Sequence, residues 1–179
     1  MADYYTEFCE RILLDLPTEE SRGDALEWWR EIMSIGAALC RDSDDTIQST
    51  LADLGVGMDE DILAAIREGS YPEFDIEIEE HTAPNCTHAV WLSSTDGSGN
   101  LGILTTLVSA YIRKFAPNAV FTLTWSDRCS EMRLSEFGGG AMAISVNGAL
   151  TVSTASMCAE LVPRLANSAL ETRKEKELS

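Results

Sequence analysis

The spacing of apolar residues changes near residue 73, and this change limits the possible folds more than any other feature of the sequence. Before that point, apolar residues recur at steps of three and four, which is the period of one face of an α-helix. From residue 73 to residue 79 every second residue is apolar, which is the period of a strand with one buried face. The sequence therefore predicts an acidic helical region over residues 1–70 and a sheet domain over residues 71–179, or one continuous domain that contains both.

Start and stop signals divide both regions into elements. Pro17 ends the first predicted helix and Thr18 can cap the second. Beyond residue 70 the pattern predicts the order ββαβββα, with Asn147-Gly148 as a hairpin turn. Strands that follow one another in runs favour an α+β fold with a mainly antiparallel sheet and helices on one face. The helices expected before residue 70 cover residues 3–16, about 18–41, 44–54 and 59–68.

The charge of the 179-residue chain is strongly negative and unevenly distributed. Its formal net charge is -17, and residues 1–82 hold 22 acidic and 5 basic side chains, while residues 83–179 hold 8 of each. Such a field repels nucleic acid and anionic membranes, which argues against direct binding to either and favours a basic partner. The five cysteines show no paired close spacing, which suggests reduced thiols rather than disulfides. No apolar run is long enough to cross a membrane. Together these features lead us to expect a cytoplasmic protein.

The alternating segment carries the candidate binding surface. As a strand it would bury Phe74, Ile76 and Ile78 and expose carboxylates about 6.6 Å apart, a spacing comparable to that of phosphates along a nucleic-acid strand. The outer face of the second predicted helix is also acidic. We expect these carboxylates to form one continuous exposed surface that occupies a Lys/Arg groove, although charges on an edge strand can serve only to prevent aggregation. The candidate partner-binding residues are Glu73, Asp75, Glu77, Glu79 and Glu80 in the strand and Glu20, Asp24, Glu27 and Glu31 in the helix.

A glycine-rich loop offers a different function. Gly97-Ser98-Gly99-Asn100-Leu101-Gly102 matches the G-x-G-x-x-G pattern of dinucleotide-binding turns, in which backbone N–H groups hold a pyrophosphate at a helix N-terminus. Four polar residues separate the preceding strand from this loop, and a hairpin rather than a second α/β unit follows. An ordinary loop before a helix is the simpler interpretation.

Histidine and cysteine residues suggest two further sites. His81, Cys86 and His88 lie within eight residues and Cys129 could complete a tetrahedral zinc set, but their spacing matches no usual ligand pattern. Cys129 could also act as a nucleophile, with a distant histidine as base and the amides of Gly138–Gly140 as an oxyanion site. A small buried thiol and a bend in the sheet explain the same residues more simply. We therefore assign no catalytic residue, no metal ligand and no cofactor.

Trp28 and Trp29 are consecutive in the second predicted helix. Successive residues of a helix point in different directions, so both rings cannot be buried along the same line. One of them is therefore expected at the boundary of the core or on the surface, where exposed aromatic residues often serve interfaces.

Two short segments carry a resemblance. Residues 125–130, Trp-Ser-Asp-Arg-Cys-Ser, and residues 136–141, Glu-Phe-Gly-Gly-Gly-Ala, are similar to a stretch in a group of small uncharacterised proteins of bacteria, phages and plasmids. The resemblance covers roughly residues 88–155. It implies a mobile-element origin and an α+β core, and it implies no activity and no catalytic residue.

The charge partition and the alternating strand lead to one hypothesis and two alternatives. The hypothesis is an acidic protein-binding inhibitor, encoded by a phage or another mobile element, that mimics nucleic acid and blocks a basic surface of a host defence complex, for example as an anti-CRISPR protein. The first alternative is a small enzyme or nucleotide-binding module that uses the Gly97–Gly102 loop or Cys129. The second is an oligomeric accessory protein whose acidic face only keeps it soluble.

Overall fold

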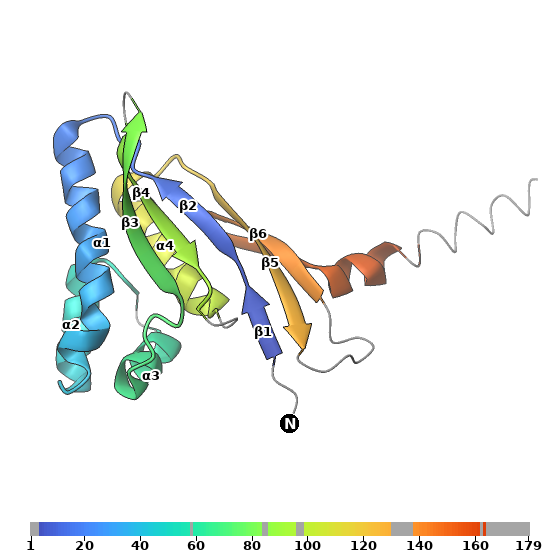
Figure 1. Ribbon diagram of the computed structural model, residues 1–179. Coiled ribbons are helices and arrows are strands. Elements are labelled where there is room, and N and C mark those ends of the chain that lie inside the picture. The colour runs from blue at the N-terminus through green and yellow to red at the C-terminus, as the bar shows by residue number, and fades with distance from the viewer. Residues whose placement is uncertain are drawn as a thin grey trace, which may run out of the picture.

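The computed structural model describes residues 4–57, 59–83, 86–95, 99–129, 138–161 and 163. Figure 1 shows α1, α2 and α3 grouped beside β3, and α4 behind the strands. No helix in the described ranges combines the length and the apolar character needed to cross a membrane. In chain order the elements are β1 (Tyr4–Glu7), β2 (Cys9–Leu13), α1 (Glu19–Leu39), α2 (Asp44–Asp53), α3 (Glu60–Glu68), β3 (Asp75–Ala83), β4 (Cys86–Ser93), α4 (Leu101–Phe115), β5 (Phe121–Cys129), β6 (Gly138–Ser145), β7 (Gly148–Ser153) and a helix over residues 154–161.

Strands β1 and β2 precede α1, so the expected order, in which helices precede every strand, is wrong. Residues 4–13, expected within a helix over residues 3–16, form the whole of β1 and β2 with Phe8 between them. The apolar residues of this segment fit a helical period as well as an alternating one, and Ile12, Leu14 and Leu16 are the alternate residues that are buried. Pairing with β4 and β5 decides between the two periods, because the strand satisfies backbone groups of both neighbours. The protein is α+β with two antiparallel sheets.

The two sheets meet at the N-terminal strands. One sheet has the order β2-β4-β3 and the other the order β1-β5-β6-β7. Phe8 alone separates β1 from β2, so one nearly continuous run of backbone pairs with β5 through its first half and with β4 through its second half. This connection leaves β3 and β7 as outer strands at opposite ends of the strand order.

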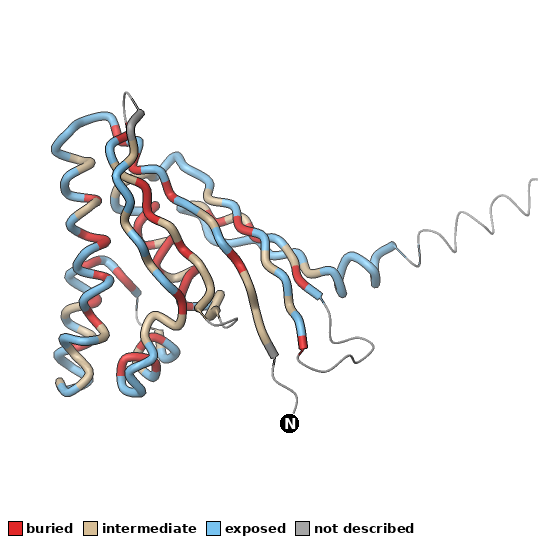
Figure 2. The backbone as a smooth tube through the Cα atoms, viewed as in Figure 1, coloured by how far each residue is buried: buried red, intermediate tan, exposed pale blue. Residues whose placement is uncertain are grey.

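Helix α4 supplies the centre of the hydrophobic core. Its buried residues face the strands on one side and α1 and α3 on the other, and Figure 2 shows that buried positions alternate with exposed ones along the strands. One face of the strands is therefore covered and the other is open to solvent. The buried residues of α4 are Ile103, Leu104, Leu107, Val108, Ala110, Tyr111 and Ile112.

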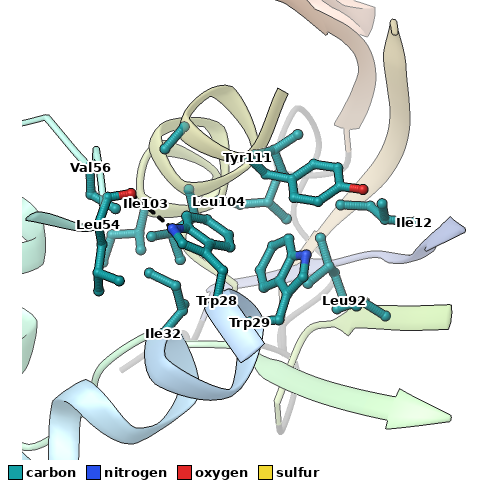
Figure 3. Packing of buried hydrophobic residues seen from close by; sticks show 14 of the residues in the cluster. Ile12, Trp28, Trp29, Ile32, Leu54, Val56, Leu92, Ile103, Leu104 and Tyr111 are labelled. Atoms are coloured by element: carbon teal, nitrogen blue, oxygen red, sulfur yellow. Dashed lines mark hydrogen bonds between the residues drawn. The ribbon is translucent and has the colours of Figure 1, made fainter. Parts of the chain in front are cut away.

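Trp28 and Trp29 of α1 are both buried, with 2% and 0% of their surfaces exposed, so the expectation of one boundary or surface tryptophan is wrong. The reason is that α1 has neighbours on two sides. The Nε1–H of Trp28 donates to the carbonyl oxygen of Leu54 at the end of α2, at 2.8 Å, whereas Trp29 packs on Tyr111 of α4 with ring centres 5.6 Å apart (Figure 3). The tryptophan pair thus fixes α1 against α2 and α4 together.

Candidate functional site on the acidic edge strand

Strand β3 has one covered face and one exposed face, as the alternation of its residues predicts. Ile76 and Ile78 are half-buried on the face toward α1. Asp75, Glu77 and Glu79 are exposed, and the alternation along the strand places them on the opposite face of the sheet, with Glu77 also bordering the hollow between β3 and α1. We call these three carboxylates the β3 row. Because β3 is an outer strand, the row borders solvent at the edge of the sheet as well as on its open face.

An aromatic residue and an arginine lie beside the β3 row on the open face. The register of the strands places Trp91 of β4 between Glu77 and Arg11 of β2. The Nε1–H of Trp91 donates to Glu79 Oε2 at 2.7 Å, and the guanidinium carbon of Arg11 lies 5.5 Å from the centre of the Trp91 ring. The row therefore adjoins an aromatic surface held by a hydrogen bond and a cation–π contact. Sequence reasoning misses Arg11, because the residues around it fit a helical period.

Glu73 and Glu80 lie outside the β3 row, so the row holds three of the five strand carboxylates that were expected to bind a partner. Glu73 precedes the strand, is half-buried and has a φ of 64°. Its carboxylate accepts hydrogen bonds from Asn100 Nδ2 at 2.7 Å and from Ser70 Oγ at 3.3 Å, which ties it to the start of α4. Glu80 is opposite His88 in the register and borders the hollow between β3 and α1.

The acidic residues of α1 form a second exposed group. Glu20, Asp24, Glu27 and Glu31 are all exposed, and spacings of three and four residues place them on one side of the helix. We call them the α1 ridge. Glu31 borders a hollow between α1 and α2, whereas β3 adjoins the side of α1 that carries Met33. The ridge and the β3 row thus face different directions, and the single continuous acidic surface expected from the sequence is divided in two.

Within the ranges that the structure describes, cations leave the β3 row unneutralised. None of the ion pairs there includes a carboxylate of the row, and one of them includes a residue of the α1 ridge. All three pairs are solvent-exposed, and pairs of that kind contribute little to stability. The row therefore keeps its charge available for a partner. The pairs are Arg30 with Glu27 at 3.5 Å, Arg128 with Glu7 at 2.6 Å, and Arg67 with Asp44.

The glycine-rich loop offers no phosphate site in its described part. Residues 96–98 lie outside the described residues. The side chain of Asn100 already accepts hydrogen bonds from the N–H groups of Gly102 and Ile103, at 3.0 and 3.1 Å, and these are amides that a pyrophosphate would need. The carboxylate of Glu73, which is bonded to the same Asn100, adds a negative charge that would repel phosphate. Asn100 acts here as a helix cap.

The zinc set considered for His81, Cys86 and His88 does not form among the described residues, where no group of three or more His, Cys, Asp or Glu side chains could hold a metal ion. Cys86 is buried, and its Sγ donates to the backbone carbonyl of His88 at 3.1 Å. The Nδ1 atom of His88 instead lies 3.0 Å from the hydroxyl of Thr87. These residues have local structural contacts rather than a shared centre.

Cys129 is a buried thiol far from the histidines along the sheet. It pairs with Tyr4 at the start of β1, whereas the carbonyl of His88 accepts from the N–H of Leu14, just beyond β2. Ten residues of extended backbone span about 33 Å, and His81 of β3 lies near the His88 end. No Cys–His dyad can therefore involve Cys129 and either histidine.

The glycines of Gly138–Gly140 allow close packing between strands. Gly139 has a φ of 143°, a conformation that favours glycine. A side chain at Gly140 would collide with the ring of Trp125 on β5 and with the carbonyl of Val152 on β7. These contacts explain the glycines without an oxyanion site. Residues 130–137, which include part of both resembling segments, lie outside the described residues.

Comparisons with protein-family models, with curated proteins and with solved structures found no match to this chain. Its function is therefore inferred from the chemistry and geometry of its own residues.

Proposed function

We propose that this protein binds a basic protein surface through the β3 row and thereby keeps nucleic acid away from that surface. The observation that carries the proposal is a set of three exposed carboxylates on an outer strand, which take part in no ion pair among the described residues. Lys and Arg side chains that normally contact successive phosphates would meet carboxylates about 6.6 Å apart. The net charge of -17 would steer the protein toward such a groove and speed association.

Trp91 supplies an anchor in addition to charge. Tryptophan and arginine are enriched among the residues that dominate the binding free energy of interfaces. The Trp91 ring is kept in place by contacts with Glu79 and Arg11, so it loses little conformational freedom on binding. A guanidinium group of the partner could form paired hydrogen bonds with a carboxylate of the β3 row beside the ring.

The proposed partner is a nucleic-acid-handling or defence complex of a bacterial host, and a CRISPR effector is the first candidate. The resemblance of residues 125–130 and 136–141 to proteins of phages and plasmids supports this choice, because mobile elements gain from blocking host defence. On this proposal the protein is an inhibitor that acts by occupying a site, and its activity requires no cofactor.

A competition for DNA tests the proposal. A purified CRISPR effector loaded with guide RNA is mixed with a fluorescent target duplex, and fluorescence anisotropy reports the bound fraction of DNA as the wild-type protein is added. We expect the bound fraction to fall, and to fall less at high salt, because the contact joins opposite charges. Undiminished DNA binding would remove that effector as the partner.

Two charge-reversal variants locate the surface that competes, after circular dichroism has shown that each is folded. Loss of competition in the β3 row variant alone supports the proposal. Equal loss in both variants would mean that only net charge matters, and loss in the α1 ridge variant alone would assign binding to the ridge. If neither variant loses competition, the acidic residues serve solubility. The variants are Asp75→Lys/Glu77→Lys/Glu79→Lys in the row and Glu20→Lys/Asp24→Lys/Glu27→Lys in the ridge, which change the net charge equally.

A further inference from the structure

Residues 138–159 contain no charged side chain, although charged residues make up 24% of the chain. This uncharged stretch includes β6, β7 and most of the helix that follows. Large apolar side chains are exposed along it and just beyond it: Leu150 is 79% exposed, Val152 is 47% exposed, and Val146, Met157 and Leu161 are exposed as well. Exposed apolar side chains that gather in this way mark an interaction surface more often than scattered ones do.

The two outer strands differ in how they are protected against pairing with another strand. Strand β3 presents the β3 row to solvent, and its pairing with β4 shifts in register between Glu80 and Ala83. Charged side chains and bulges both keep the edge of a sheet from pairing. Strand β7 pairs with β6 at six consecutive positions without a shift, and it contains neither a charge nor a proline. Its outer edge lacks the protection that β3 has.

We infer that the outer edge of β7 pairs with β7 of a second copy of this chain. Leu150 and Val152 point to the open face, because their register partners in β6 alternate with the buried residues Met142 and Ile144. Antiparallel pairing about a two-fold axis at Thr151 places Leu150 of each copy opposite the partner's Val152. Such cross-strand apolar pairs stabilise a sheet and would cover the most exposed side chains of the strand. The two four-stranded sheets would then form one eight-stranded sheet.

Charge determines the edge through which two copies can meet. Each copy has a net charge of -17, so two copies repel wherever their acidic surfaces approach each other. Residues 83–179 hold equal numbers of acidic and basic side chains, and β7 lies at the opposite end of the strand order from β3. Contact through β7 therefore keeps the two β3 rows at the far ends of the dimer. The dimer leaves the β3 row of each copy free for the proposed partner. The inference of a dimer does not depend on the proposed function.

The helix after β7 extends the same uncharged surface. Residues 154–161 are exposed throughout, and Figure 2 shows this helix projecting from the sheet. Met157 and Leu161 are four residues apart, so they lie on one side of the helix. In a dimer the two helices begin beside the new strand pair, where these side chains can be covered.

The mass of the full chain in solution tests the inference. Under reducing conditions, light scattering after size-exclusion chromatography should give twice 19.6 kDa at high protein concentration, and added salt should tighten the dimer by screening the repulsion between copies. Leu150→Lys/Val152→Lys should stay monomeric. The control Val120→Lys alters a valine that is 63% exposed outside β7 and should dimerise like the wild type. A wild type that is monomeric at every concentration, or a dimer that survives Leu150→Lys/Val152→Lys, would overturn the inference.

Hydrogen exchange of the unmutated protein gives a second readout. The amides of β7 should exchange more slowly at concentrations where the dimer forms, while the amides of β3 should not change. Protection of β7 in a monomer would instead mean that another part of the same chain covers the edge. That result, or β7 amides that stay unprotected at every concentration, contradicts pairing between copies.

Discussion

Replacing Trp28 by Phe should destabilise the protein more than the same replacement of Trp29, although the two rings are buried side by side. The indole N–H of Trp28 donates to the carbonyl of Leu54 at 2.8 Å. The indole N–H of Trp29 is buried with no hydrogen-bond partner among the described residues. The two substitutions therefore remove the same atoms from one region of the core but have opposite effects on hydrogen bonding.

The size of the difference follows from these contacts. Trp28→Phe deprives the buried Leu54 carbonyl of its donor, which costs about 1–3 kcal/mol. Trp29→Phe removes a buried donor without a partner, whose burial costs about 1–3 kcal/mol on mutational scales, and so offsets part of its packing loss. Since the lost apolar contacts are similar in both, the free energy of unfolding of Trp28→Phe should be lower than that of Trp29→Phe by about 2 kcal/mol or more.

Urea titrations at pH 7, followed by far-ultraviolet circular dichroism, measure both free energies without relying on tryptophan fluorescence, which each substitution alters. The comparison requires equal dependence of the free energy on urea in the two variants. If Trp28→Phe proves as stable as Trp29→Phe, or more stable, the reasoning is refuted, because the bond between Trp28 and Leu54 would then carry no net free energy.

Two further predictions concern α4. Burial, with a smaller contribution from Cys86, raises the pKa of Tyr111 to about 12, above its value of about 10 in the unfolded chain. The contribution of Tyr111 to stability should therefore be fully present below pH 10. Between pH 10 and pH 12 the free energy of unfolding should fall by up to about 1.4 kcal/mol per pH unit. Urea titrations at pH 9, 10 and 11 should show this fall in the wild type and a smaller fall in Tyr111→Phe. Asn100→Ala should lower the free energy of unfolding by about 1 kcal/mol, because the amides of Gly102 and Ile103 lose the side chain that caps them. Asn100→Ser, whose hydroxyl can accept from the same amides, should lose much less in the same titrations. The cap assignment is wrong if Asn100→Ala leaves the free energy of unfolding unchanged. The Tyr111 assignment is wrong if the wild type and Tyr111→Phe lose equal free energy of unfolding at alkaline pH.

Strand β3 could be predicted from its residues because its two faces meet different surroundings. Helix α1 covers the face with Ile76 and Ile78, and solvent covers the other face, so the alternation of residue types corresponds directly to the structure. The position of Glu73 could not be predicted in this way. Its carboxylate is held by Asn100, a residue distant in the sequence, and no local pattern contains that contact.

The N-terminal strands and the tryptophan pair show the same limit. The first 16 residues fit two periods, and only the pairing of β1 and β2 with strands much later in the chain selects the alternating one. Trp28 is buried because the end of α2 accepts its hydrogen bond, which a helical period cannot reveal. Arg11 is absent from the predicted site for the same reason. It lies beside Trp91 only because its segment forms strand β2, and the local pattern fits a helix as well as a strand.

The junction between β1 and β2 has a consequence for synthesis of the chain. This run of backbone leaves the ribosome before the strands with which it pairs, since Tyr4 has its partner in Cys129 and Cys9 has its partner in Ser93. Contacts between residues so distant in sequence form slowly, and unpaired strands in a nascent chain are prone to misassembly until their neighbours exist. A ribosome must therefore deliver β4 and β5 before β1 and β2 can take their final place, so these two strands settle long after they are synthesised.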